Sequence, residues 1–124
     1  MLQIAIPVIS VKDSVRTEAY YCQVLGFQKM FGYRPAPDRS DPTYLGVQRD
    51  GVWLHLDSFK PERAGRTGAF FWVADVDAIH AEITARGARC QLPPTDQTWG
   101  NREIHILDPD DNVLVFASYP KPAA

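Results

Sequence analysis

The strongest constraint on the fold is an internal repeat with a period of 61 or 62 residues. Three signals recur at this spacing, namely the tripeptides at 11–13 and 73–75, the glycines Gly26 and Gly87, and the turn-forming pairs at 50–51 and 111–112. Half of a 124-residue chain cannot bury a sheet face alone. Two copies of one unit should therefore pack around a shared core.

Each unit reads as a strand, a helix and three further strands. The first unit predicts strands at 4–11, 27–33, 43–48 and 52–58 and a helix at 14–24 with an apolar stripe of Val15, Ala19 and Cys22. The second unit predicts strands at 69–73, 88–92, 104–107 and 113–116 and a helix at 76–86 with a stripe of Val76, Ile79 and Ile83. Asp13 and Asp75 are the expected helix N-caps.

This order predicts an α+β fold of two tandem βαβββ modules that form a concave mixed β-sheet with the helices outside. The whole chain, residues 1–124, should be one domain, with modules at about 1–62 and about 66–120. Pro7 predicts that the first strand lies at a sheet edge. The proline-rich segment 34–42 should be a mobile loop of a length often found in lids, and 93–98 a second loop.

Composition excludes several classes of function. The net charge is −2, and the basic residues are scattered among acids, which argues against nucleic-acid binding. No segment approaches the ~20 apolar residues that a membrane span needs. The first ten residues lack a basic leader and a cleavage site, so we expect a cytoplasmic protein. Cys22 and Cys90 have no metal-type spacing and are expected to be packing residues.

Three segments carry a resemblance that covers essentially the whole chain. They are DSVRTEAYYCQVLGF at 13–27, VADVDAIHAEITARGA at 73–88 and WGNREIHILDPDDN at 99–112. Together they resemble the vicinal oxygen chelate superfamily, which includes glyoxalase I, extradiol dioxygenases, fosfomycin-resistance enzymes and bleomycin resistance proteins. Within this superfamily the chain looks most like the bleomycin-resistance branch. The similarity lies in the Ile-Pro-Val opening, the strand GVWLHL and the segment WGNRE. Asp111 stands where that pattern usually has glycine.

The resemblance also implies where metalloenzyme members would hold a divalent ion. Those four positions fall on Ile6, His55, Gly68 and Val115, of which only His55 could bind a metal. Since a catalytic metal needs about three protein ligands, we expect no metal, no cofactor and no catalytic residues, and we lean against an enzyme.

Strand alternation assigns the side chains to faces. Trp53, His55 and Asp57 point away from the apolar row of their strand. The predicted ligand-binding set on this face is Tyr44, Gln48, Trp53, His55, Asp57, Phe70, Trp72, Trp99, Glu103 and His105. Aromatic rings with a few polar groups suit a partly planar, cationic or amphiphilic ligand. The competing interpretations are that Phe70 and Trp72 are core residues and that Glu103 forms a sheet-edge ion pair with Arg102.

The leading hypothesis is a metal-free small-molecule binding protein that sequesters an antibiotic of bleomycin type or a related metabolite. The resemblance implies a homodimer with grooves between subunits and an exchanged first strand, Leu2–Val8. The alternative is a metal-dependent lyase or dioxygenase whose site has moved to His55, Glu103 and His105. A partner-docking domain without a ligand is a third possibility.

Overall fold

The computed structural model describes residues 1–121, so the last three residues of the predicted domain, 122–124, lie outside the described residues. The first module contains β1 (Val8–Ser10), α1 (Ser14–Ala19) continued by the π-helical turn η1 (Tyr20–Val24), β2 (Gln28–Tyr33), β3 (Tyr44–Arg49) and β4 (Val52–Asp57). After the short helix η2 (Pro61–Arg63), the second module contains β5 (Gly68–Trp72), α2 (Val76–Ala85), β6 (Arg89–Asp96), β7 (Arg102–Leu107) and β8 (Val113–Ser118). The predicted α+β order is confirmed.

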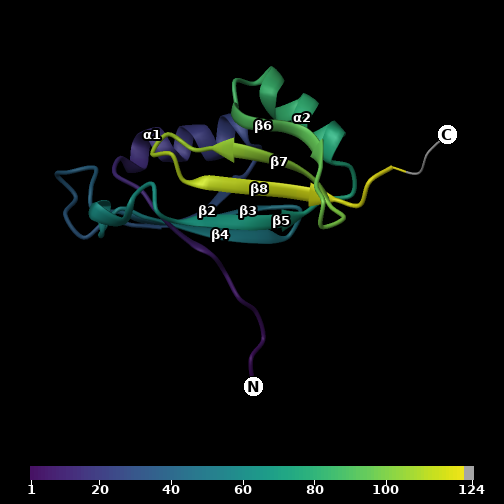
Figure 1. Cartoon of the computed structure of the whole chain (residues 1–124). Helices are drawn as coiled ribbons and strands as arrows, with labels where there is room; N and C mark the ends of the chain where they lie inside the picture. Colours follow the sequence, from purple (N-terminus) through teal and green to yellow (C-terminus); the bar gives the residue numbers. More distant parts are fainter. Residues whose placement is uncertain (122–124) are drawn as a thin grey trace.

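Each module forms a four-stranded mixed sheet. The strand orders are β1-β4-β3-β2 and β5-β8-β7-β6, and the first strand of each module pairs in parallel with the last. The two sheets meet where β1 lies beside β5, and there the Ser10 amide donates to Thr67 Oγ1 over 3.1 Å. Figure 1 shows α1 and α2 together on one side of the sheets. The opposite faces of the sheets carry neither α1 nor α2.

The core lies between the helices and the apolar rows of both sheets. In the first sheet Leu45 pairs with Leu56 and Val47 pairs with Leu54. In the last hairpin His105 faces Val115. Because alternation places every second side chain on the same face, these registers decide which residues point away from the helices.

The turn at Asp108–Asn112 connects the modules. Asp108 Oδ1 accepts bonds from the amides of Asp110 and Asn112, both over 2.9 Å. Asn112 Nδ2 donates to the Ser10 carbonyl over 2.8 Å, and Asn112 Oδ1 accepts from the amides of Gly65 and Thr67. The buried Asn112 therefore ties the inter-module linker and the first strand to the last hairpin.

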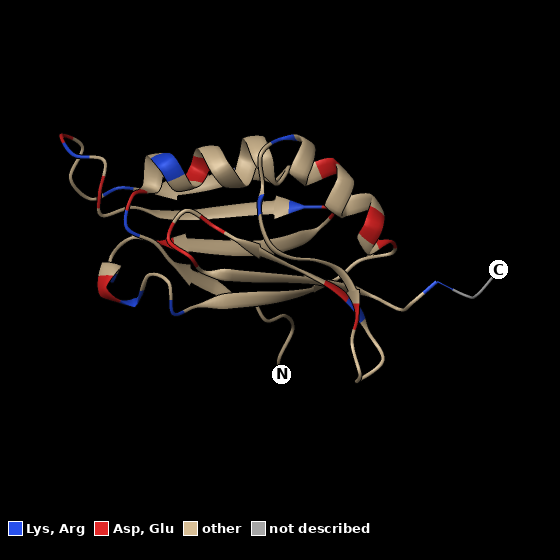
Figure 2. Cartoon of the chain, turned by 45° about the horizontal axis from the view of Figure 1, so that its top comes forward, with Lys and Arg blue, Asp and Glu red and all other residues tan. Residues whose placement is uncertain are grey.

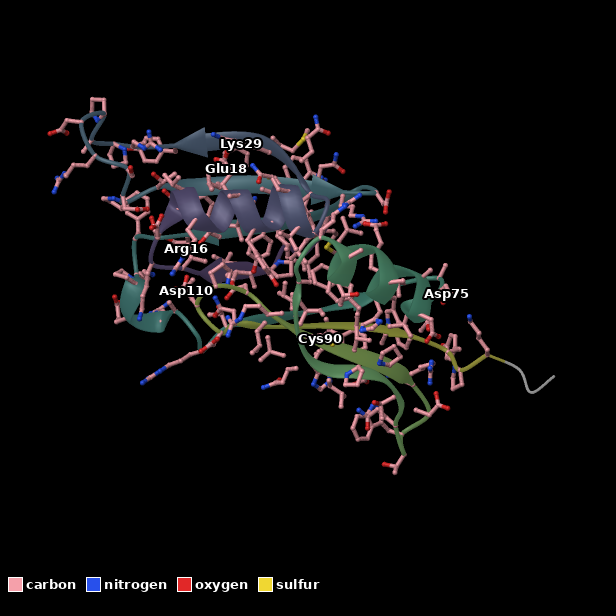
Figure 3. All side chains as sticks on the ribbon, turned by 90° about the horizontal axis from the view of Figure 1, so that it is seen from above. Arg16, Glu18, Lys29, Asp75, Cys90 and Asp110 are labelled. Carbon is pink, nitrogen blue, oxygen red and sulfur yellow. The ribbon has the colours of Figure 1, made fainter. Side chains whose placement is uncertain are left out.

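Helix α1 is attached to the same turn. Arg16 points toward Asp110, and the two side chains form an ion pair of 2.9 Å (Figure 3). The buried Tyr21 hydroxyl donates to Asp108 Oδ2 over 2.8 Å. Burial and the neighbouring Asp108 carboxylate hold the pKa of Tyr21 well above its ordinary value, so this hydroxyl remains a donor.

The first strand is shorter than predicted. Residues 1–7 form no strand, and the side chains of Leu2 and Ile4 are 102% and 70% exposed relative to a free chain. In Figure 1 this segment leads away from the body of the protein. Without a neighbouring strand to receive its hydrogen bonds, an extended segment does not become part of a sheet.

The predicted apolar stripe of the first helix is wrong at Val15 and Ala19, and only Cys22 packs against the core. Val15 is 58% exposed and Ala19 is also exposed, whereas Ser14, Thr17 and Tyr21 are buried. Ser14 can be buried because its backbone and hydroxyl are satisfied by Asp41 and the Ser40 carbonyl. The stripe of α2 is confirmed, since Val76 and Ile83 are fully buried and Ile79 packs against the core.

Two further predictions need correction. Strand β6 continues through Pro93 and Pro94 to Asp96, where a loop was predicted. This is possible because β6 is an edge strand with register shifts, where a missing N–H is tolerated.

Cys90 is exposed and is not a packing residue, whereas Cys22 is partly buried against the core. No helix within residues 1–121 is long and apolar enough to cross a membrane.

Candidate functional site

The ten predicted ligand-binding residues fall into two groups on different sheets. Tyr44, Gln48, Trp53, His55 and Asp57 belong to β3 and β4, while Phe70, Trp72, Glu103 and His105 belong to β5 and β7, and Trp99 precedes β7. Strands β1, β5 and β8 lie between β4 and β7. His55 on β4 and Glu103 on β7 are thus four strand spacings apart, roughly 19 Å along the sheets, whereas Phe70 and Trp72 on β5 lie two spacings from β4. One chain therefore does not bring the Tyr44–His55 pair next to Glu103 and His105.

The first group is centred on a hydrogen bond between Tyr44 and His55. The Tyr44 hydroxyl lies 2.9 Å from His55 Nδ1. Burial raises the pKa of Tyr44, with Asp57 adding to the effect, so the hydroxyl is neutral and can donate to the imidazole. The His55 ring is therefore held at a fixed angle on the open face of β4.

Phe31 belongs to this group and was missed by sequence reasoning. Its ring stacks on Tyr44 at a centroid distance of 6.4 Å and meets the edge of His55 at 5.4 Å. It lies directly over Gly46, where an added Cβ would overlap Phe31 Cε2. A glycine inside a strand signals such a close approach, and Gly46 between Leu45 and Val47 was the available clue.

Gln48 and Asp57 have structural partners on the backbone. Gln48 Oε1 accepts from the amide of Gly51 over 3.0 Å, which braces the β3–β4 turn. Asp57 Oδ1 accepts from the amide of Phe59 over 2.7 Å at the end of β4. Trp53 is half-buried and faces Gln48 across the hairpin.

The second group contains a row of exposed aromatic rings. Phe70 and Trp72 meet edge to face at 5.3 Å, and Trp72 stacks on Tyr119 at 5.3 Å. Their exposed fractions are 49%, 57% and 76% respectively. Phe70 and Trp72 are therefore surface residues, and the competing interpretation of both as core is wrong. Tyr119 lies just beyond the last predicted strand, so strand alternation did not include it.

Glu103 is the most constrained polar residue on this face. It is only 4% exposed, and its Oε2 accepts from Trp99 Nε1 over 2.9 Å and from Asn101 Nδ2 over 3.3 Å. His105 Nε2 lies 3.2 Å from Oε1. Burial by itself raises the pKa of this carboxyl, but the bonds from Trp99, His105 and Asn101 outweigh burial, and the pKa is lowered. Glu103 is an ionised carboxylate that orients three side chains.

Trp99 is both exposed and fixed. Its side chain is 64% exposed although the indole N–H is bound to Glu103. Arg102 does not pair with Glu103, contrary to the competing interpretation. Its guanidinium binds both oxygens of Asp77 on α2, at 3.0 and 2.9 Å, on the opposite side of the sheet.

The structure does not assemble the relocated metal site within one chain. Within residues 1–121, no three His, Cys, Asp or Glu side chains are placed to hold a metal ion. His55 lies on the first sheet, whereas Glu103 and His105 lie on the second. At Gly68, one of the four positions implied by the resemblance, an added Cβ would lie 2.5 Å from the Val113 carbonyl oxygen, so that position has no room for a ligand side chain.

A cavity of about 500 Å³ lies between the two modules, beside α2. Of the ten predicted residues only Trp72 lines it. The remaining lining comes from the ends of β2 and β5, the β3–β4 turn, α2 and β8, and sequence reasoning did not single it out.

Comparison with known proteins identifies the family. The model of the Glyoxalase/Bleomycin resistance protein/Dioxygenase superfamily matches residues 3–116. A bleomycin resistance protein of Geobacillus stearothermophilus is 26% identical over 130 residues, which cover 94% of this chain and 96% of that protein. A bleomycin resistance protein of Staphylococcus aureus strain N315 matches with the same identity and coverage.

Solved structures agree in fold over nearly the whole chain. The bleomycin-binding protein of Streptomyces verticillus, complexed with copper(II)-bleomycin, matches with a TM-score of 0.77 and 26% identity, covering 98% of this chain and 100% of that one. An antibiotic-binding protein from Streptomyces sp. CB03234 matches with a TM-score of 0.74 and 25% identity, covering 97% and 99%. This chain belongs to the glyoxalase/bleomycin resistance protein/dioxygenase superfamily.

Proposed function

We propose that this protein is a metal-free binding protein that sequesters an antibiotic of bleomycin type or a related planar, cationic metabolite. The observation that carries the proposal is the arrangement of Trp99 and Glu103. An indole that is 64% exposed is held in one orientation by a carboxylate that is 4% exposed. A ring fixed before binding loses little conformational freedom when a planar group stacks on it.

The charge on this face favours a cationic ligand. The lowered pKa of Glu103 keeps one negative charge beneath Trp99 and His105. Exposed aromatic faces attract a cation as well, by about 0.5–2 kcal/mol for each good contact. The similar bleomycin-binding and antibiotic-binding proteins support a small-molecule ligand at this face.

We further propose that the complete groove forms between two copies of the chain. The two groups of ligand-binding residues lie on separate sheets, and each presents exposed rings, such as Phe31 at 42% and Trp72 at 57%. In a homodimer the open face of one copy's first sheet could meet the open face of its partner's second sheet. Exchange of the first strand, Leu2–Val8, would cover the exposed N-terminal residues. The cytoplasmic location and the single-domain assignment remain predictions.

The direct test is a calorimetric titration of the protein with metal-free bleomycin. We expect binding in the micromolar range or tighter, and at least tenfold weaker binding for Trp99→Ala and for Glu103→Gln. Gln23→Ala, an exposed position on η1, is the control and should leave binding unchanged.

Two results would contradict the proposal. Absence of binding at micromolar bleomycin would remove the drug as ligand. Stoichiometric zinc, nickel, manganese or iron in protein purified without chelators, lost in His105→Ala, would favour a metal-dependent lyase or dioxygenase instead.

A further inference from the structure

We propose that the cavity between the modules is a second binding site, and that it takes a small aromatic ammonium ion. The cavity has a volume of about 500 Å³, within the range of ~300–1,000 Å³ typical of small-molecule sites. It is separate from the aromatic sheet face, because Trp99, Glu103 and His105 do not line it. The inference therefore does not depend on the proposed antibiotic function.

The floor of the cavity is aromatic and is the part of the core that remains open to solvent. Phe27, Phe71 and Phe116 are 6%, 8% and 5% exposed, whereas every other apolar core residue is at most 2% exposed. All three rings line the cavity. Phe71 stacks on Phe116 at 4.8 Å and meets Phe27 at 6.2 Å. A flat apolar group placed here would remove the exposed remainder of these rings from water.

The rim of the cavity is negatively charged. Asp50, Asp75 and Glu82 line it together with a single cation, Arg49. Figure 2 shows acidic positions at the start of α2 and along it. The formal charge of the lining is thus −2, which favours a cationic ligand and disfavours an anionic one.

Arg49 is already engaged and is not free to bind an anion. Its guanidinium donates to Glu82 Oε1 over 2.8 Å, and its Nη1 lies 2.7 Å from Glu82 Oε2 and from the Leu25 carbonyl oxygen. The Glu82 hydrogen bond, partly offset by desolvation, raises the pKa of Arg49. The carboxylate of Asp50 is left with a weaker partner, and Asp75 caps α2 by accepting a hydrogen bond from the Ala78 amide over 3.2 Å. Asp50 lies 3.6 Å from Arg49 Nε, and Asp75 lies 3.5 Å from the exposed Lys121.

Trp72 forms one wall between the cavity and the aromatic sheet face. The residue lines the cavity, while its indole packs with Phe70 and Tyr119 on the sheet face. An ammonium group at the rim can lie beside the carboxylates, which suits a primary aromatic amine better than a neutral ring of equal size.

The test uses three probes with one ring system: 2-naphthylmethylammonium, 2-naphthylmethanol and 2-naphthoate. Binding is measured by calorimetry and by chemical-shift changes in the full-length protein. We expect the ammonium probe to bind at least fivefold more tightly than the alcohol and at least twentyfold more tightly than the carboxylate.

Matched substitutions on α2 locate the site. Ala78→Phe places a ring at the cavity lining and should weaken ammonium binding at least tenfold, whereas Ala81→Phe, exposed on the same helix but outside the lining, should leave it unchanged. Asp50→Asn should weaken the ammonium probe two- to fivefold and leave the alcohol unchanged. Asn tolerates the positive φ of 52° at this position.

The proposal is overturned if the ammonium probe does not bind at millimolar concentration, if the carboxylate binds as tightly, or if Ala78→Phe has no effect in a protein whose melting curve is unchanged. If Ala78→Phe fails to fold, Asp50→Asn tests the proposal instead. The proposal is then overturned if Asp50→Asn does not weaken binding of the ammonium probe relative to the alcohol probe. Binding that appears only after residues 1–6 are removed would instead identify the N-terminal segment of another copy as the occupant. Trp99→Ala should leave naphthylmethylammonium binding unchanged, which separates this site from the antibiotic site.

Discussion

Glu103 on β7 has a buried carboxylate with three side-chain partners, Trp99, Asn101 and His105. Its folded-state pKa is lowered because bonds from Trp99, His105 and Asn101 overcome the effect of burial. A carboxyl group whose folded pKa is lowered stabilises the protein above its unfolded pKa. That stabilisation is lost as the pH falls through the folded pKa.

Glu103→Gln should lower the free energy of unfolding at pH about 7 by about 1–3 kcal/mol, because the charged acceptor of three hydrogen bonds is lost. The difference from the unmodified protein should shrink at about pH 3, below the ordinary glutamate pKa of about 4.3, because protonation of the unmodified carboxyl removes the same stabilisation. Urea denaturation at the two pH values measures both effects.

Glu62→Gln, an exposed position on η2, is the control and should change the stability little at either pH. An equal loss of stability at the two pH values in Glu103→Gln would contradict the assigned charge of Glu103.

Alternation along the strands was enough to predict that Glu103 and His105 share a face. The same rule places Arg102 on the other face, where it binds Asp77, so its pairing with Glu103 could have been rejected from the sequence. Phe31 was harder to assign, because the register shift between Lys29 and Phe31 breaks the alternation on β2.

At the scale of elements, Gly46 and Phe31 form a matched pair across β3 and β2. The Phe31 ring occupies the space above Gly46. Gly46→Ala should destabilise the protein by about 1–3 kcal/mol, since the methyl group must displace the ring.

In a protein that already carries Phe31→Ala, the substitution Gly46→Ala should lower the free energy of unfolding much less, because no ring then occupies the space above Gly46. A double-mutant cycle of thermal or urea unfolding measures the difference. If Gly46→Ala lowered the free energy of unfolding equally with and without Phe31→Ala, the Phe31 ring would not be the reason for glycine at position 46.

Elements with strong local signals were predicted and confirmed. The Asp50-Gly51 turn has positive φ values of 52° and 79° at its two central residues, as a primed hairpin turn requires. Predictions failed where tertiary context decided the outcome. Pro93 and Pro94 have the composition of a loop but extend an edge strand. The buried face of α1 uses Ser14 and Thr17, and the burial of Ser14 depends on hydrogen bonds to the distant Asp41 and Ser40.

At the scale of the whole molecule, the exposed N-terminal segment is the feature that a homodimer would explain. Met1, Leu2 and Ile4 are apolar and exposed, and the Pro7 carbonyl already accepts a bond from the His55 amide over 3.0 Å. The chain up to residue 6 contributes little to the folded protomer. Burial of these side chains against a second copy would remove an exposed apolar surface.

Removal of residues 1–6 should therefore convert the proposed dimer into a folded monomer. Sedimentation equilibrium measures the change in mass, and the melting curve shows whether the protomer remains folded. Leu2→Asp and Ile4→Asp should each weaken the dimer by at least tenfold, while Gln3→Asp should have a smaller effect. A full-length protein that sediments as a monomer at high concentration would contradict the proposed homodimer.

The bond from Asn112 to the Ser10 carbonyl has a consequence for synthesis of the chain. It joins residues 102 positions apart, so the C-terminal turn must exist before the first strand can be locked in place. A growing chain therefore completes most of its length while β1 and the linker still lack their final partner. During that interval the apolar residues of the first module are not yet packed against those of the second, with which they share one core.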